Sequence, residues 1–407
     1  MEKIAIIFSI LFILNLTSNS KALILDSLLG VVGGLVGNTA TQIINIIRNT
    51  LAGVLDLTND ELLNLTEVLR LLKSIGISID TKKLKLTAQN VVEINELTNG
   101  IWTAKLGFYS LLPDEDQKKI CGVLDFVEGE GGDKSRDRRA ARNKRKVNCS
   151  YKTEFDVRDK WPGCRSIINH VQDQGFCGSC WAVSTASAFT DRYCIERAKK
   201  GLKTPNNANN IFSSFDVLAC SPAKGCTGGW PVKAWESIKS NGICTGSDFN
   251  DKNGCKPYPF GPTERYPILK ACKKSCTNSY WEKPYDNDRM NYVISVSTLN
   301  GEDAIKDELR KNGPVVAIFS VYKDFYSYSD GVYYRVWGEL DKSHAVVIVG
   351  YGTANCGYEK IPYWIIRNSM GTNWGEGGYF KFRRGDNECG IEAKISFGIP
   401  KVNSSYT

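Results

Sequence analysis

The sequence contains very little histidine, with only His170 and His344 among its 407 residues. Protein sites for transition metals commonly draw on several imidazole ligands, so this scarcity argues against a metal centre. We therefore expect neither a metal nor any other cofactor. Any thiol or acid–base chemistry that needs an imidazole must use one of these two side chains. The chain also lacks internal repeats and low-complexity tracts, which excludes a repeat architecture.

A broad basic surface is also missing, although the formal net charge is +8. The excess is strongly clustered between Glu130 and Lys146, and the rest of the chain is close to balanced. A basic groove with interleaved aromatic residues is therefore not indicated, and we expect no nucleic-acid partner. The basic residues of this cluster are Lys134, Arg136, Arg138, Arg139, Arg142, Lys144, Arg145 and Lys146.

No apolar run near the N-terminus is long enough to span a bilayer. Residues 4–16 are apolar, follow Lys3 and precede the small residues 18–20, an arrangement typical of a secretory signal peptide over residues 1–20. Fourteen cysteines fit maturation in an oxidising compartment. We expect the protein to enter the secretory pathway and to be lysosomal, endosomal or secreted. The glycine-rich apolar stretch 23–37 is interpreted as part of a pro-segment rather than as a membrane anchor.

The basic cluster lies in a linker over residues 129–146 that has almost nothing to bury. It contains two sites of the form that secretory convertases cleave, ending at Arg139 and Arg145. A solvated basic loop is the simpler alternative, but two such sites between different chain regions favour processing. We therefore predict a propeptide over 21–145 and a mature domain over 146–407. Within the propeptide, apolar spacing predicts helices over residues 43–55 and 58–76.

The mature region divides into two parts with different expected secondary structure. Residues 180–245 favour helices, whereas residues 314–400 favour strands. The predicted strands are rich in β-branched and aromatic residues and are punctuated by Gly and Asn. They cover residues 315–321, 344–349, 363–367 and 379–383.

Cys180 has the features of a reactive thiol. It follows Gly178 and Ser179, and the run from Cys180 to about residue 198 has helical character. A cysteine at the positive end of a helix has a stabilised thiolate, which is the nucleophilic form. The alternative is that Cys180 is one more disulfide partner among fourteen cysteines.

His344 is the preferred base because it opens the apolar run His-Ala-Val-Val-Ile-Val-Gly, which predicts a rigid strand. His170 lies in a polar segment with nothing to orient it. Asn368, at the end of the next predicted strand, could fix the imidazole ring. Gln174 could supply an amide donor which, with the backbone N–H of Cys180, would form an oxyanion hole worth roughly 3 kcal/mol of barrier.

The run Cys-Gly-Ser-Cys-Trp at 177–181 is the papain/cathepsin signature, with His and Asn far downstream. The chain resembles cathepsin B-type members of the papain-like cysteine proteases over residues 91–400. Trp102-Thr-Ala and Cys121-Gly are similar to the cathepsin B pro-segment, which occupies the cleft and keeps the enzyme inactive. Further similar runs begin at Gly225, Gly254, Lys311, Asp330, Gly371 and Cys389.

The resemblance implies an α+β fold with a helical subdomain that carries the catalytic cysteine and a β-barrel-like antiparallel subdomain, preceded by a largely helical propeptide. It implies Cys180 as nucleophile, His344 as general base and acid, Asn368 as the residue that orients His344, and Gln174 as oxyanion donor. The residues it assigns to substrate binding are Gly228, Gly229, Trp374 and Lys394. The glycine pair could instead serve only as turn formers.

The same resemblance implies four disulfides and leaves Cys149, Cys244, Cys356 and Cys389 unplaced. The implied partners are polypeptide substrates, the chain's own propeptide as cleft inhibitor, and a proprotein convertase for maturation. The four implied pairs are Cys164–Cys194, Cys177–Cys226, Cys220–Cys272 and Cys255–Cys276.

Three departures from the family pattern shape the expected activity. The stretch 258–267 has no histidine, whereas cathepsin B uses paired histidines there to hold a substrate's C-terminal carboxylate. Endopeptidase action is therefore expected. Arg265 could still meet a carboxylate, but a solvated loop is the preferred interpretation. Met370 replaces the tryptophan that usually shields the Asn–His bond. Lys394 stands where an acidic residue usually lines the P2-side pocket, which disfavours basic P2 side chains and could admit acidic ones.

The competing hypothesis is a catalytically silent, cathepsin-like binding or storage protein. Such proteins usually lose the nucleophile, whereas Cys180, His344, Asn368 and Gln174 are all present. We therefore predict a cysteine endopeptidase made as an inactive proenzyme.

Overall fold

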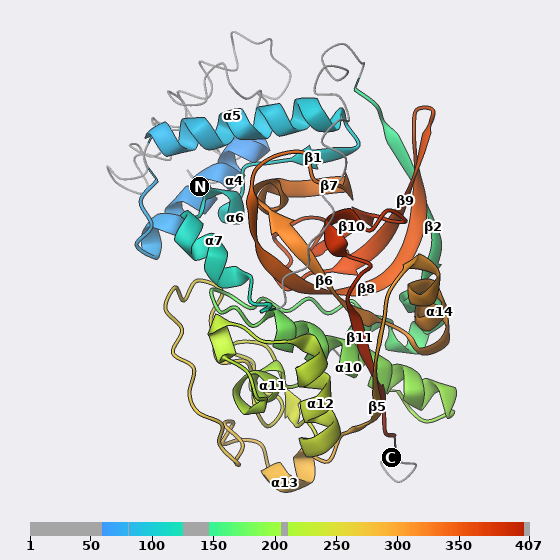
Figure 1. Ribbon diagram of the computed structural model, residues 1–407. Helices are drawn as coiled ribbons and strands as arrows, with labels where there is room; N and C mark the ends of the chain where they lie inside the picture. The colour runs from blue at the N-terminus through green and yellow to red at the C-terminus, as the bar shows by residue number, and fades with distance from the viewer. Residues whose placement is uncertain (1–58, 80, 125–145, 205–210, 403–407) are drawn as a thin grey trace, which may run out of the picture. The chain divides into compact units, whose positions relative to one another are not determined.

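The computed structural model describes residues 59–79, 81–124, 146–204 and 211–402 (Figure 1). The chain divides into two compact units after Asn90. The predicted signal peptide, the predicted helix over 43–55 and the basic processing sites lie outside the described residues. In the part of the chain that is described, no helix combines the length and apolar character needed to cross a membrane.

The first unit contains the helix α4 (Asn59–Ser74), which confirms the helix predicted over residues 58–76. Its residues Leu65, Leu69 and Leu72 are buried and recur at helical spacing, so they share one apolar face. The next helix, α5 (Thr81–Thr98), begins in the first unit and ends in the second.

In the second unit, residues 101–124 form a segment that we call the crossing segment. It begins with β1 (Trp102–Ala104), which pairs antiparallel with β7 (Tyr328–Tyr333). Trp102 is buried against Tyr333, with ring centroids 5.2 Å apart, and this contact fixes the start of the segment. The helices α6 (Phe108–Leu111) and α7 (Asp114–Ile120) follow. Three acidic residues in the first turn of α7 and two lysines in its last turn match the helix dipole.

A helical half is built around α10 (Cys180–Lys199), which is buried along most of its length. Its first two turns carry small residues such as Ala182, Ser184 and Ala186, which allow neighbouring elements to approach closely. Ser184 Oγ donates to the Ala345 carbonyl at 2.8 Å, so α10 is bonded directly to the sheet half. The helical half contains β3 (Ile211–Phe212), α11 (Ser214–Cys220), η3 (Gly225–Thr227), α12 (Pro231–Asn241), β4 (Thr245–Gly246) and α13 (Tyr285–Asp288).

The other half is a curled sheet in the order β1-β7-β10-β9-β8-β6-β11-β5, with β2 added on β8 (Figure 1). All four predicted strands are confirmed as β6, β8, β9 and β10. The sheet differs from the barrel-like antiparallel expectation in two ways: among the described strands no pairing closes it, and β10 runs parallel to β7. The bounds are β2 (Cys149–Asp156), β5 (Val293–Leu299), β6 (Val315–Tyr322), β8 (Leu340–Cys356), β9 (Glu359–Arg367), β10 (Tyr379–Arg383) and β11 (Ile395–Pro400).

Short helical elements complete the second unit. The sheet half carries α14 (Glu302–Asn312), whose buried Ile305 and Leu309 lie one turn apart on the same face. Gly313 ends this helix with a positive φ of 98°, a conformation that favours glycine. The remaining elements are α8 (Val157–Lys160), η2 (Pro162–Cys164), α9 (Arg165–Ile168), η4 (Lys323–Ser327) and η5 (Glu388–Gly390).

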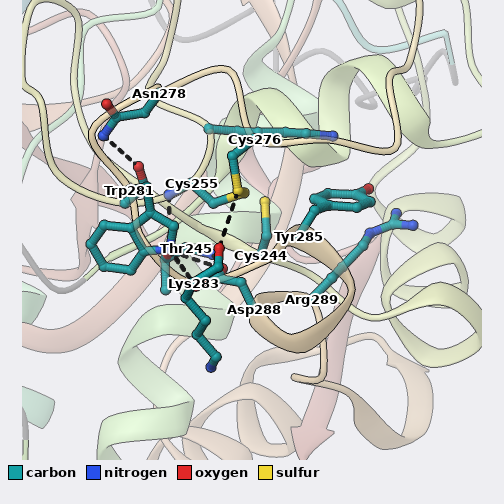
Figure 2. The surroundings of a disulfide bond; sticks show 12 residues. Cys244, Thr245, Cys255, Cys276, Asn278, Trp281, Lys283, Tyr285, Asp288 and Arg289 are labelled. Carbon is teal, nitrogen blue, oxygen red and sulfur yellow. Dashed lines mark hydrogen bonds between the residues drawn. A yellow bond between two sulfur atoms is a disulfide. The ribbon is translucent and has the colours of Figure 1, made fainter.

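Five disulfides cross-link the second unit. Four are the pairs implied by the family resemblance, and the fifth joins Cys149 to Cys356, which the sequence left unplaced. Cys244 remains a thiol, buried beside the Cys255–Cys276 bond (Figure 2). Asp288 lies close to the Cys244 and Cys255 sulfurs, but Cys255 is oxidised and so cannot offer a thiolate to a metal.

Candidate active site

Cys180 is the first residue of α10, with Ser179 as its N-cap, and it is completely buried. The backbone N–H of Gly122, in the crossing segment, donates to its Sγ at 3.3 Å. Hydrogen bonding from the Ala345 backbone also reaches the sulfur, which places the thiol beside the residue that follows His344. The helix N-terminus and these donors are suited to stabilising a thiolate.

His344 lies within β8 and is completely buried. Its Nε2 is 2.8 Å from Oδ1 of Asn368, which is the first residue after β9. The same Oδ1 accepts the backbone N–H of Ser369 at 2.8 Å, which identifies it as the amide oxygen. His344 Nε2 therefore donates, and the other ring nitrogen, Nδ1, carries the lone pair. Nδ1 has no hydrogen-bond partner among the described residues, so it is the nitrogen left to exchange a proton.

Gln174 is held in a fixed orientation. Its Oε1 accepts a hydrogen bond from Ser369 Oγ at 2.6 Å, and its Nε2 donates to the Cys177 carbonyl at 2.8 Å. The second hydrogen of Nε2 bonds to the Ile120 carbonyl at 2.7 Å. The Gln174 amide donor is therefore already bound to a carbonyl oxygen of the crossing segment. Ser369 was not among the predicted site residues, because nothing in the spacing of the sequence links it to Gln174.

The crossing segment continues past Cys180 along the glycine loop. Gly229 N–H donates to the Gly122 carbonyl at 2.9 Å, and Leu124 N–H donates to the Gly229 carbonyl at 3.1 Å. Gly228 has a positive φ of 136°, and a Cβ there would lie 2.7 Å from the side chain of Leu124. The backbone of this loop therefore makes strand-like contacts with an extended chain, which a side chain at Gly228 would obstruct.

Burial under the crossing segment keeps the thiol and the imidazole neutral. Desolvation raises the pKa of Cys180 from 9.0 to about 11, although backbone hydrogen bonds oppose the change. Desolvation lowers the pKa of His344 from 6.5 to about 4, against the opposing effect of the Asn368 hydrogen bond. At neutral pH the pair is therefore a thiol and a neutral imidazole, not the reactive thiolate and imidazolium.

The family model of the papain family cysteine proteases matches residues 151–399, which include Cys180, His344 and Asn368. The chain belongs to the papain family of cysteine proteases. This papain-family chain is 35% identical to cathepsin B-like cysteine proteinase 6 of Caenorhabditis elegans over 350 residues, covering 80% of this chain and 86% of the relative. It is 34% identical to a cathepsin B-like cysteine proteinase of Schistosoma japonicum, covering 78% of this chain and 92% of that protein.

Among solved structures, procathepsin B S9 from Trypanosoma congolense matches with a TM-score of 0.59 and 29% identity. The match covers 77% of this chain and 98% of that structure. Together with the family membership, it identifies the papain-family chain as a cysteine peptidase in zymogen form that acts on polypeptides. Its own propeptide is the inhibitor, and the crossing segment, which contacts Cys180 through Gly122, lies within the range predicted for that propeptide.

The remaining predicted binding residues lie in different surroundings. Trp374 is buried in an aromatic cluster, with ring centroids 4.9 Å from Phe325 and 5.4 Å from Phe380. Lys394 lines a cavity of about 410 Å³ together with Pro231, which is two residues beyond Gly229. The substrate-binding roles of Trp374 and Lys394 stay predictions.

Two features at the edges of the site differ from expectation or were not foreseen. Met370 is buried, and its carbonyl accepts the Tyr109 hydroxyl at 3.1 Å, so the propeptide covers this position. The expectation that Arg265 is solvated is wrong. Its side chain is only 14% exposed, because it forms an ion pair with Asp116 of α7. The sequence does not identify Asp116 as the partner, since 149 residues separate the two.

Proposed function

We propose that the mature protein is a cysteine endopeptidase in which Cys180 attacks the scissile carbonyl and His344 transfers the proton. The observation that carries the proposal is the hydrogen bond from His344 Nε2 to Asn368 Oδ1, which leaves the Nδ1 lone pair for the Cys180 thiol. When the propeptide leaves, water can reach both groups. The desolvation that keeps them neutral is then relieved, which favours a thiolate–imidazolium pair.

The proposed reaction follows from the positions of the donors. The Cys180 sulfur bonds to the substrate carbonyl carbon, and the oxygen that becomes negative is stabilised by Gln174 Nε2 and the Cys180 N–H. His344 then gives its proton to the departing amine, which leaves an acyl-enzyme. A water molecule, deprotonated by His344, attacks the acyl carbon and restores the thiol. The Gly229 backbone would bind the acyl part of the substrate as it binds residues 122–124 of the propeptide.

Endopeptidase rather than carboxydipeptidase action is proposed because residues 258–267 contain no histidine. The position of Lys394 on the cavity near Gly229 supports discrimination against basic side chains at P2, with acidic ones admitted. We further propose maturation by a convertase after Arg139 or Arg145, a mature chain that begins near Lys146, and a lysosomal, endosomal or secreted location. The catalytically silent alternative would keep the fold without the reactivity.

The test uses the zymogen cleaved after Arg145 and treated with an epoxysuccinyl thiol inhibitor, with the adduct mapped by mass spectrometry. We expect labelling at Cys180 with loss of peptide hydrolysis, and neither labelling nor hydrolysis in Cys180→Ala. The buried thiols Cys244 and Cys389 of the mature domain serve as internal controls. Absence of a Cys180 adduct, together with no hydrolysis between about pH 4 and 7, would favour the silent alternative.

Internally quenched peptides, compared with release of C-terminal dipeptides, separate the two modes of cleavage. Faster cleavage within the quenched peptides supports endopeptidase action. Predominant dipeptide release would overturn that part of the proposal.

A further inference from the structure

Asn148 opens the sequence Asn-Cys-Ser over residues 148–150, at the start of the strand β2. In a chain that enters the secretory pathway, Asn-x-Ser is the acceptor sequence for N-linked glycan. Asn148 and Ser150 are exposed, whereas Val147 and Cys149 are half-buried. This alternation puts the Asn and Ser of the acceptor sequence on the same, solvent-facing side of the chain.

The half-buried neighbours of Asn148 contact the propeptide. Val147 N–H donates to the Asn99 carbonyl at 2.9 Å, and Cys149 Sγ lies 3.9 Å from the Gly100 carbonyl oxygen. A Cβ at Gly100 would lie 2.4 Å from the Val147 carbonyl oxygen, so the two segments approach closely. These contacts hold the residues on either side of Asn148 and leave its own side chain exposed, so a glycan there extends into water.

The cysteine inside the acceptor sequence does not block modification during synthesis. Cys149 pairs with Cys356, which follows it by 207 residues. At roughly 5–20 residues per second, synthesis of that stretch takes about 10–40 s. The disulfide cannot form before its second cysteine exists, so Asn148 passes the glycan transferase as part of an unfolded segment.

The position of Asn148 also matters because β2 is an edge strand. Among the described strands β2 pairs only with β8, at the border of the sheet (Figure 1). An unpaired edge is a template for pairing with another chain unless charge, bulk or a covering segment protects it. Lys152 and Glu154 place charges on the later half of β2. Residues 149–151 carry no charge and include Tyr151, which is 42% exposed.

We propose that Asn148 carries an N-linked glycan in both the zymogen and the mature enzyme, and that this glycan protects the uncharged start of the β2 edge. The mature chain is proposed to begin near Lys146, so the modified residue stays with the enzyme after processing. The acceptor sequence at Asn64 lies in α4 and leaves with the propeptide. The inference rests on the proposed entry into the secretory pathway.

The test expresses the full-length chain in secreting eukaryotic cells and purifies it from cells and medium. Treatment with peptide N-glycosidase in heavy-oxygen water converts each glycan-bearing Asn into isotope-labelled Asp. Peptide mass spectrometry then assigns the label among Asn64, Asn148 and Asn403. We expect most molecules to be labelled at Asn148, in the uncleaved zymogen and after removal of the propeptide.

The variant Ser150→Ala removes the acceptor sequence but keeps Asn148, so it should abolish the label at that residue. Ser150→Thr is the matched control and should retain the label, because Thr preserves the acceptor sequence at the same exposed position. Asn148→Gln removes the glycan with Ser150 unchanged, which separates the loss of the glycan from any effect of Ser150 on β2.

Light scattering at equal protein concentration measures the protection of the β2 edge. We expect a larger self-associated fraction in Ser150→Ala and Asn148→Gln than in the wild type and Ser150→Thr. Adding Tyr151→Lys to Ser150→Ala should lower that fraction again, because a lysine on an edge strand opposes pairing with another chain.

The outcomes separate the glycan from the proposal on which it rests. A chain that stays in the cytosol, with no label at any acceptor sequence, contradicts both the secretory entry and the glycan. Entry into the pathway with unlabelled Asn148 overturns the glycan assignment and leaves the secretory entry standing. A label at Asn148 with equal self-association of the wild type and Ser150→Ala supports the modification site and overturns its protective role.

Discussion

At the scale of single residues, desolvation disfavours the charged forms of both Cys180 and His344. Both groups are completely buried, and burial disfavours a charged thiolate and a charged imidazolium alike. The hydrogen bonds that would favour the charged forms are already present, from Gly122 and Ala345 to the sulfur and from His344 to Asn368. Restoring water to the cleft changes the balance without any new protein contact.

The pH dependence of Cys180 alkylation tests this account. The thiolate is the reacting form, and raising the pKa of Cys180 from 9.0 to about 11 lowers its thiolate fraction about 100-fold at any pH below both values. We expect iodoacetamide labelling of the zymogen to rise about tenfold per pH unit from pH 7 to 10, with no plateau. The mature enzyme should label at Cys180 from about pH 4 upward. Equal pH profiles, read by mass spectrometry, would contradict the account.

At the scale of elements, inhibition depends on how closely the crossing segment approaches the start of α10. A Cβ on Gly122 would lie 1.8 Å from the Gly178 carbonyl oxygen, so only glycine fits there. The Gly122 N–H donates to Cys180 and its carbonyl accepts from Gly229, so one residue makes both central contacts. A displacement of this residue therefore loosens the whole segment over the thiol.

The uncleaved zymogen of the variant Gly122→Ala should hydrolyse peptides faster than the uncleaved wild-type zymogen. Overpacking typically costs about 1–3 kcal/mol, so we expect basal peptide hydrolysis to rise roughly 5- to 150-fold. Gly107→Ala in the same segment is the matched control, because a Cβ there meets nothing within 4 Å. Equal leakage from both variants would mean that the close approach at Gly122 does not set the strength of inhibition.

At the scale of the whole second unit, a buried ion pair joins the helical half to the sheet half. Arg367 Nη2 at the end of β9 lies 2.7 Å from Asp191 Oδ2 of α10, and both side chains are almost fully buried. Arg367 directly precedes Asn368, so the same pair that joins the halves also positions the partner of His344. Ser184 adds a second bond between the halves through Ala345.

Removal of one member of the Asp191–Arg367 ion pair should lower both the stability and the catalytic rate. Asp191→Asn leaves Arg367 without its buried counter-charge, which typically costs about 3–5 kcal/mol. We expect a lower midpoint of urea unfolding and a lower kcat on peptide substrates. The control Asp307→Asn breaks the exposed pair with Arg310, and pairs of that kind contribute little. A wild-type midpoint in Asp191→Asn would show that the pair is not needed to join the halves.

The amino-acid sequence was enough to identify the family and much of the local structure. Two histidines restricted the base to His170 or His344, and the signature around Cys180 identified the family. Alternation and β-branched runs located four strands, because hydrophobic periodicity is a local property. The strands β2, β5, β7 and β11 were not predicted, since their residues are less uniformly apolar and depend on neighbours for pairing.

The long-range pairings became visible only in the folded chain. The Asp116–Arg265 and Asp191–Arg367 ion pairs, the Ser369–Gln174 hydrogen bond and the Cys149–Cys356 disulfide join residues between 149 and 207 positions apart. No local pattern carries such information, because charged and polar side chains at these spacings are equally compatible with solvent. The histidine shortage pointed to His344 and to the absence of the usual carboxylate receptor. In the fold, Arg265 is buried against the carboxylate of Asp116, on the side of the Cys180 thiol away from Gly229.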